Sequence, residues 1–527
     1  MKIEILDSTL RDGAQGEDIS FSLSDKLAIV RALSELGIDL IEAGNPGSNP
    51  KDAEFFREAG RLNLGGSQLV AFGSTRRKQV SAEEDAGLSS LLLAGTEVVC
   101  IFGKASALHV AHVLETTQEE NLSMISDSIR FLRQAGKRVI FDAEHFFDGC
   151  IANSAYAFRV LQAAADAGAD TLCLCDTNGG TFPAEIEHLT RLACEKFPGL
   201  RIGIHCHNDC GLAAAGSIAA VQMGVAQVQG TLLGFGERCG NANLSTLLPS
   251  LQLKMGYRCI PEDAMENLTR VCLAVADTAN ISLPGNLPYV GASAFAHKAG
   301  MHVDAVNKLH ASFEHISPSK VGNKRRRLVG EVSGKSALLR MVQRFDPEVK
   351  KDSPALADIM DRLKRMEFAG YQFEAAEESL ILLIRRSLHL QEKFFELDHY
   401  KLIGEYPLFA QLSPSSAMVK VRVGGESSLT SAEGNGPVNA LDLALRRALI
   451  PFYPCLTDMR LADYKVRVLE SDATTAAGVR VLIESTDGEK AWRTVGVSAD
   501  ILEASFIALS DSIEYKLTLE KEKGALS

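Results

Sequence analysis

The stretch Arg201-Ile202-Gly203-Ile204-His205-Cys206-His207 is a short apolar run that ends in two histidines separated by one residue. Side chains in a β-strand alternate between its two faces, so His205 and His207 point to the same side of the expected strand. A similar run near the start of the chain, 4–10, is followed by Asp12. Two neutral imidazoles and a carboxylate suit a divalent cation. The alternative is a pair of core histidines, and the surrounding pattern decides between these interpretations.

The first 250 or so residues repeat one unit, consisting of a short apolar strand, a polar or glycine-rich loop and an amphipathic helix. The expected strands cover 3–10, 38–43, 69–73, 97–102, 138–143, 170–175, 202–206 and 226–232. Helical patterns lie between them at 24–36, 121–135, 155–167, 183–196 and 212–223. Strands that alternate with helices indicate a parallel sheet. Eight such units in about 250 residues match a closed (β/α)8 TIM barrel better than an open doubly wound sheet.

In such a barrel the loops that follow the strands form the active-site face. Several polar residues fall at the expected strand ends or in the loop after them: Asp12, Glu144, Thr177, His205, His207 and Asn241. The closed barrel would bring these side chains together. This convergence favours a metal site over a pair of core histidines.

Bulk composition excludes several other classes of protein. The chain has 527 residues and a formal net charge of −12, which argues against general nucleic-acid binding. Its 11 cysteines have no framework spacing and suit reduced thiols in a cytosol. No apolar run has the length of a membrane helix, and the chain enters a strand too early for a leader peptide. We therefore expect a cytoplasmic protein of two or three domains.

Several motifs suggest chemistry at the strand ends. Arg11 adjoins Asp12, keeps that carboxylate ionised, and could polarise a carbonyl oxygen. The segment 234–241 fails the dinucleotide spacing and is interpreted as a tight loop that delivers Asn241 as an oxygen ligand. The segment 330–336 has one residue too few between its glycines to be a phosphate loop. A basic run, 324–327, is either a solvated face or a polyphosphate contact.

The expected fifth and sixth strands end in further candidates. Asp142 and Glu144 share one face, and Glu144, nearer the loop, is the better acid/base or orienting group. Cys173 and Cys175 lie within the sixth strand, where packing explains them better than metal binding. Thr177 can donate its hydroxyl to a substrate carboxylate.

Past residue 255 the strand–helix rhythm stops. A helix is expected over 262–281, followed by further helical stretches between about 333 and 390. The last 130 or so residues contain two weak repeats of strand, glycine turn and helix, which suggest an α+β regulatory or dimerising module. The expected domains are therefore a barrel over 1–255, a helical linker region over 256–390 and a C-terminal regulatory domain over 391–527.

Taken together, these motifs resemble the acyl-CoA-condensing, metal-dependent synthases, the family of 2-isopropylmalate, homocitrate and citramalate synthases. The resemblance covers nearly the whole chain and is carried by the segments 7–13, 205–209, 236–241 and 300–304. Three further stretches, 42–50, 142–149 and 432–441, are most similar to the pyruvate-using members. The resemblance implies an acyltransferase whose acyl group becomes an alkyl group on transfer. Acetyl-CoA would condense with pyruvate, and thioester hydrolysis would release CoA and (R)-citramalate for isoleucine biosynthesis.

The resemblance also assigns roles. A divalent metal, Mn²⁺ or Mg²⁺ with Zn²⁺ also suitable, would be held by Asp12, His205, His207 and Asn241. Thr177 would bind the pyruvate carboxylate and Arg11 its keto oxygen. His302 would be the general base or its relay, assisted by Glu144 and Asp304.

The linker of this family reaches into the partner subunit's barrel, so the resemblance implies a homodimer whose C-terminal domain binds isoleucine as an allosteric inhibitor. The chain departs from the family at Phe313, where a tyrosine is typical and where no hydroxyl is available.

Three rival functions remain open. A 2-isopropylmalate synthase would use the same barrel chemistry with 3-methyl-2-oxobutanoate as the acceptor. A non-catalytic amino-acid-binding regulator would keep only the C-terminal sensor. An acyl-CoA lyase would run the reverse reaction, but it would not need the long C-terminal extension.

Overall fold

The computed structural model describes residues 1–297, 305–306, 308–327, 335–404, 415–469, 478–488 and 490–524. The chain forms two compact units, one of residues 1–296 and 314–326, the other of residues 297–313 and 327–527. Each unit has its own apolar core among the described residues.

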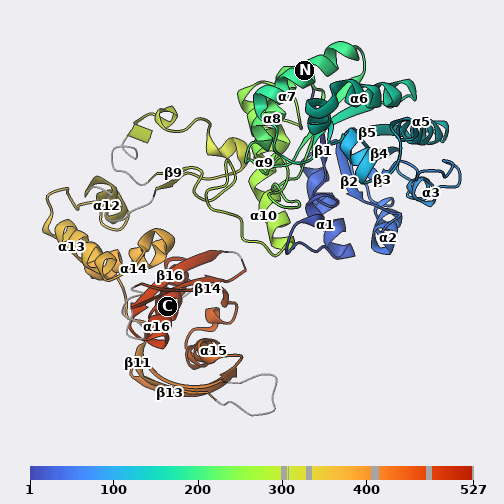
Figure 1. Ribbon diagram of the computed structural model, residues 1–527. Coiled ribbons are helices and arrows are strands. Elements are labelled where there is room, and N and C mark those ends of the chain that lie inside the picture. Colours follow the sequence, from blue (N-terminus) through green and yellow to red (C-terminus); the bar gives the residue numbers. More distant parts are fainter. Residues whose placement is uncertain are drawn as a thin grey trace. The chain divides into compact units, whose positions relative to one another are not determined.

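The first unit contains a closed barrel of eight parallel strands (Figure 1). They are β1 (Glu4–Asp7), β2 (Leu40–Gly44), β3 (Gln68–Ser74), β4 (Val98–Lys104), β5 (Arg138–Glu144), β6 (Thr171–Asp176), β7 (Arg201–Cys206) and β8 (Gln227–Gly230). Strand β8 closes the barrel against β1, with Glu4 opposite Gln227. The predicted TIM barrel is confirmed. Strand β1 is shorter than predicted because the chain turns at Ser8, whose carbonyl accepts from the Gly13 amide at 3.0 Å.

Helices surround the barrel (Figure 1). They are α1 (Leu23–Glu35), α2 (Pro50–Ala59), α3 (Ala86–Leu93), α4 (Ala107–His112), α5 (Gln118–Gln134), α6 (Phe146–Asp166), α7 (Pro183–Lys196) and α8 (Ala213–Gln222). Local sequence explains several boundaries: Ser22 and Asp25 form a capping box at α1, and Pro183 opens α7. Helix α6 begins earlier than predicted, and its break at Asn153 separates the unexpected first part from the predicted second part.

The barrel interior is apolar in its middle and also carries buried polar groups. A separate apolar cluster inside it includes Leu6, Leu40, Val70, Cys100, Cys173 and Cys175, which agrees with a packing role for the two β6 thiols. Glu42, Gln227 and Gln229 are all 0% exposed, and Asp142 is 5% exposed. Buried polar groups need partners, and Gln229 donates to both Gln227 and Asp142, whereas Glu42 accepts from Ser8 and Arg11.

After β8 the chain continues into two further helices, α9 (Leu244–Pro249) and α10 (Leu268–Thr278). The prediction of one helix over 262–281 was wrong in its bounds. Residues Asp263–Asn267 form a separate 3-10 turn, and α10 ends before Asn280, which has a positive φ of 56°.

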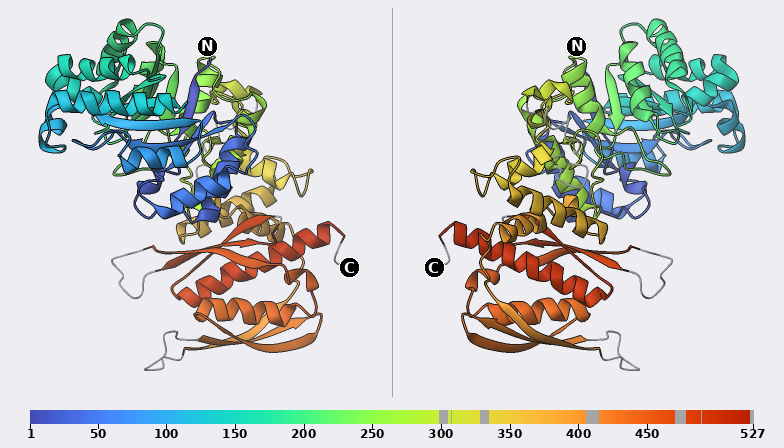
Figure 2. Two further views of the ribbon diagram at one scale, coloured as in Figure 1. Left: turned by 90° about the vertical axis from the view of Figure 1, so that its right-hand side faces the viewer. Right: turned by 90° about the vertical axis from the view of Figure 1, so that its left-hand side faces the viewer.

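The second unit begins with the helices α12 (Lys335–Val342), α13 (Pro354–Phe368) and α14 (Glu377–Ser387). The two predicted repeats follow: β11 (Glu396–Gly404), β12 (Ser415–Val423), β13 (Glu426–Gly434) and α15 (Pro437–Leu449), then β14 (Arg460–Val468), β15 (Val479–Thr486), β16 (Ala491–Ser498) and α16 (Ile501–Glu522). Each repeat is a three-stranded antiparallel sheet with one helix. The layers run sheet, helix, helix, sheet (Figure 2).

Helix α14 packs on α16 and β16 within this unit. Arg386 on α14 donates to Asp511 and Glu514 on α16, at 2.7 Å in each case. Val495 of β16 lies in the same apolar cluster as the side chains of α13 and α14. The three helices and the C-terminal repeats therefore share part of a core.

Among the described residues no helix combines the length and the apolar character needed to cross a membrane. All 11 cysteines have free thiols.

Candidate metal centre

Asp12, His205 and His207 meet at the mouth of the barrel. Asp12 lies in the turn after β1, His205 is near the end of β7, and His207 directly follows that strand. Asp12 Oδ2 is 3.6 Å from His205 Nε2 and 3.9 Å from His207 Nε2. The three side chains are buried, and their ligand atoms lie within 4.8 Å of one another. This is the spacing of groups that could share one cation.

The protonation states of the three groups suit a cation. Burial lowers the pKa of His205 to about 4, and it also lowers the pKa of His207. Burial alone would raise the pKa of Asp12, but the charge of Arg11 and the two histidines bring it down to about 2. Near neutral pH the site therefore offers one carboxylate and two neutral imidazoles.

Asn241 reaches the same place from the glycine-rich loop after β8. Its Nδ2 donates to Asp12 Oδ1 at 3.1 Å and to the Phe235 carbonyl at 2.9 Å. The loop needs its glycines: a Cβ on Gly236 would lie 2.3 Å from Asn241 Nδ2, and one on Gly240 would lie 1.9 Å from the Gly234 carbonyl oxygen. The tight turn therefore delivers Asn241, as the sequence suggested.

The donor set fits a divalent metal. Asn241 Oδ1 is a buried polar atom without a hydrogen-bond partner among the described residues. Such groups are costly unless something binds them. A carboxylate, two imidazole nitrogens and an amide oxygen are ligands that Zn²⁺, Mn²⁺ and, with added water, Mg²⁺ accept. The assignment of these four residues as ligands stays a prediction.

Arg11 lies beside this set and is held on three sides. Its Nη1 donates to Asp12 Oδ2 at 3.0 Å and its Nε to Glu42 Oε2 at 2.6 Å. Its Cζ lies 3.7 Å from the centre of the Phe72 ring, which stacks in turn on Phe102. Nη2 has no hydrogen-bond partner in the described part of the chain, and Arg11 lines a cavity of about 280 Å³. These contacts fix the orientation of the guanidinium group and leave its Nη2 edge available to a substrate oxygen.

Glu42 was not predicted as a site residue. It stands in β2 with 0% exposure and accepts from Ser8 Oγ at 2.6 Å as well as from Arg11. A carboxylate in the apolar run Leu40-Ile41-Glu42-Ala43 was a signal that could have found it, because a buried charge requires a cation. Glu42 is a positioning residue for Arg11.

The remaining predicted residues at the mouth are Glu144 on β5 and Thr177, which directly follows β6. Glu144 ends β5, is half-buried and forms an ion pair with Lys104. Thr177 Oγ1 accepts from the His145 amide at 2.8 Å, which leaves its own hydroxyl proton available to an acceptor. Both residues are at the expected face, and their roles stay predictions.

Other predicted features lie elsewhere. His302 and Asp304 fall outside the described residues. In the basic run, Arg325 is engaged by Glu314 in two hydrogen bonds, of 2.5 and 2.6 Å. Phe313 is 49% exposed.

Three family models match the chain. The HMGL-like model matches residues 2–272, the homocitrate synthase post-HMGL domain-like model matches 289–370, and the LeuA allosteric (dimerisation) domain matches 374–517.

Among curated relatives, the (R)-citramalate synthase of Aquifex aeolicus is 49% identical, over 100% of this chain and 99% of the relative. The 2-isopropylmalate synthase of Clostridium kluyveri is 28% identical, and the match covers 100% of this chain and 99% of that relative. Among solved structures, the HMG-CoA lyase of Bacillus subtilis is 23% identical, with a TM-score of 0.46, and the match covers 54% of this chain and 95% of that one. The chain therefore belongs to the HMGL-like family and, within it, to the (R)-citramalate synthases.

Proposed function

We propose that the protein condenses acetyl-CoA with pyruvate and hydrolyses the resulting thioester to (R)-citramalate and CoA. The observation that carries this proposal is the full-length likeness to (R)-citramalate synthases in a chain whose barrel mouth unites Arg11, Asp12, His205 and His207. The enzyme is an acyltransferase whose acyl group becomes an alkyl group on transfer.

A divalent metal supports this chemistry, and the proposed ligands are Asp12, His205, His207 and Asn241. We propose Mn²⁺ or Mg²⁺, with Zn²⁺ also compatible with the two imidazoles. When bound, the metal supplies a Lewis acid for the oxygens of the 2-oxoacid.

The chain's own residues would bind and orient the 2-oxoacid. Arg11 would donate from its free edge to the keto oxygen, where negative charge develops as the new carbon–carbon bond forms. Thr177 would donate its hydroxyl to the carboxylate. The partners of both residues support these roles: Glu42 and Phe72 restrain Arg11, and the His145 amide restrains Thr177.

The condensation needs a base for the methyl group of acetyl-CoA. We propose His302 as that base or its relay, with Glu144 and Asp304 assisting. The methyl carbon loses a proton and attacks the keto carbon of pyruvate, which takes up a proton on its oxygen. Water then adds to the thioester carbonyl, and CoA leaves as its thiol.

The choice of 2-oxoacid separates this proposal from a 2-isopropylmalate synthase. The acceptor 3-methyl-2-oxobutanoate has two more carbons than pyruvate, and each extra carbon in a close-fitting pocket costs about 1–3 kcal/mol. We therefore expect kcat/KM for pyruvate to exceed that for the branched acid by about 30-fold or more. Release of the CoA thiol from acetyl-CoA measures both rates.

Removal of the metal is the control in that assay. Chelation by EDTA should stop thiol release, and added Mn²⁺ should restore it, so that thioesterase contamination is recognised. Faster use of the branched acid contradicts the pyruvate assignment. Absence of thiol release with either acid, metal present, supports the non-catalytic regulator instead.

We also propose that the protein is a cytoplasmic homodimer inhibited by isoleucine. The match to a LeuA allosteric (dimerisation) domain supports regulation and dimerisation, and the 11 free thiols suit a reducing compartment. Isoleucine is expected to lower turnover with pyruvate, whereas the same concentration of leucine should not. Turnover that leucine lowers and isoleucine leaves unchanged contradicts the proposed effector, and a monomer in sedimentation contradicts the dimer.

A further inference from the structure

A chain of hydrogen-bonded side chains runs inside the barrel from its amino-terminal end to the candidate metal centre. Its members are Glu4 on β1, Gln227 and Gln229 on β8, and His205 on β7. Gln227 Nε2 donates to Glu4 Oε2 at 2.7 Å, and Gln229 Nε2 donates to Gln227 Oε1 at 3.4 Å. At the upper end Gln229 Oε1 lies 3.2 Å from His205 Nδ1. A polar contact thus links the metal centre to the far end of the barrel.

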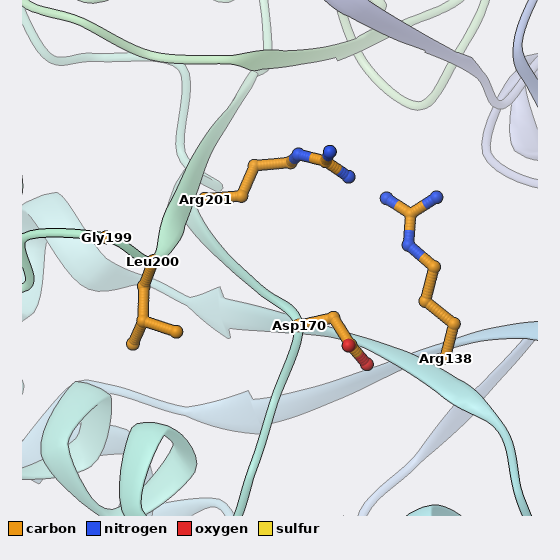
Figure 3. A pocket seen from close by; sticks show the side chains of 5 residues that line it. All are labelled: Arg138, Asp170, Gly199, Leu200 and Arg201. Atoms are coloured by element: carbon orange, nitrogen blue, oxygen red, sulfur yellow. The ribbon is translucent and has the colours of Figure 1, made fainter.

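The lower end of this chain is anchored by two arginines. Arg138 and Arg201 are the first residues of β5 and β7, and both donate to Glu4, at 2.6 and 3.3 Å. They line a hollow of about 580 Å³, across which Figure 3 shows their guanidinium groups pointing toward one another. Flanked by two permanent cations, Glu4 is ionised and can only accept hydrogen bonds.

The acceptor at Glu4 sets the direction of every bond above it. Gln227 must turn its NH₂ group toward Glu4, so its oxygen faces Gln229. Gln229 must then present its NH₂ group to that oxygen, and the same group also donates to Asp142 Oδ1 at 2.9 Å. The amide oxygen of Gln229 is left facing His205 Nδ1. An amide oxygen cannot donate, so Nδ1 must carry the proton.

The other ring nitrogen of His205, Nε2, is the one that would bind a cation. Nε2 faces Asp12 Oδ2 at 3.6 Å. A neutral imidazole with its proton on Nδ1 has a lone pair on Nε2, which is the form that binds a metal. We infer that Gln229, oriented through Gln227 by Glu4, is a positioning residue that holds His205 in the Nδ1–H tautomer with Nε2 free for a divalent cation. This inference rests on the proposed metal centre.

The tautomer can be measured without any metal. The full-length, metal-free protein is labelled with ¹⁵N-histidine, and the His205 resonances are identified by their absence in a His205→Gln variant. We expect NMR to show a protonated Nδ1 and an unprotonated Nε2. A proton on Nε2, or exchange between the two forms, overturns the inference. This measurement uses the wild-type side chain at 229, so it does not depend on how a substitution there folds.

The second measurement is Mn²⁺ affinity, followed by the EPR signal of the free ion. Gln229→Met keeps the length of the side chain and removes the acceptor, and should raise the Mn²⁺ dissociation constant about 10- to 100-fold. Asp170→Asn is the matched control, because Asp170 lies in the same lower hollow but bonds to Arg133 and the Val139 amide, outside the chain. It should leave the dissociation constant unchanged.

Two contrary results are distinguishable. A folded Gln229→Met variant with wild-type Mn²⁺ affinity overturns the role of Gln229 and leaves the metal centre standing. A wild-type protein that binds no Mn²⁺, Mg²⁺ or Zn²⁺ overturns the metal centre itself, and the inference with it.

Discussion

Replacement of His207 by alanine is expected to lower the rate of CoA release by about a thousandfold or more, because a Lewis acid contributes several kcal/mol to a condensation of this kind. The substitution removes one of the two imidazoles that face Asp12 Oδ2. Of the four proposed ligands, it leaves Asp12, His205 and Asn241. Both the affinity for Mn²⁺ and the rate at saturating Mn²⁺ should fall.

The fold should tolerate this change. His207 Nδ1 has no hydrogen-bond partner in the described part of the chain, and the His207 amide, which donates to the Asp176 carbonyl at 3.1 Å, is retained. Circular dichroism and the melting temperature of the metal-free protein check this point. His188→Ala, on the exposed side of α7, is the control and should keep full activity. Near-normal turnover by His207→Ala contradicts the metal assignment.

The second large effect is expected at Arg11. Arg11→Gln should lower kcat about 100- to 1,000-fold, the loss typical of one donor to a developing oxyanion. Glu42→Gln should have a smaller effect in the same direction, because the guanidinium stays but loses its charged partner at 2.6 Å. Both variants should retain Mn²⁺ binding, since Asp12 and the two histidines are unchanged.

An exposed arginine near the same face separates this effect from loss of general positive charge. Arg77 is 68% exposed at its side chain and pairs with Asp85, so Arg77→Gln should leave kcat near the wild-type value. An Arg11→Gln variant with wild-type kcat and only a raised KM contradicts the proposed role, because it would show equal binding of ground state and transition state.

The repeated strand–loop–helix pattern was sufficient to predict the barrel. Runs such as 69–73 and 138–143 have the length and apolar content of buried parallel strands, and β3 and β5 differ from them by one residue at each boundary or less. Short or weakly patterned helices were harder to predict from the sequence. The eight-unit pattern implied helices after the second to fourth strands, but no bounds were predicted for α2, α3 and α4, and α4 has only six residues.

The site was predicted where residues share a strand or a strand end. His205 and His207 follow from alternation along β7, and Asp12 follows from the rule that loops after barrel strands share one face. Glu42 and Gln229 were missed because their contacts join different strands. The contacts of Gln229 with His205 and Asp142 depend on the stagger between β5, β7 and β8. The stagger of a barrel cannot be predicted from the local sequence pattern of one strand.

The shared core of α14 and the C-terminal repeats determines what truncation of the second unit would expose. A cut between residues 390 and 391 would strip Arg386 of both its carboxylate partners and uncover the apolar side of α14, including Leu380 and Ile384. A truncated chain with this apolar surface exposed is expected to aggregate. Point substitutions in the terminal repeats would avoid this damage, since they leave α14, α16 and β16 in place.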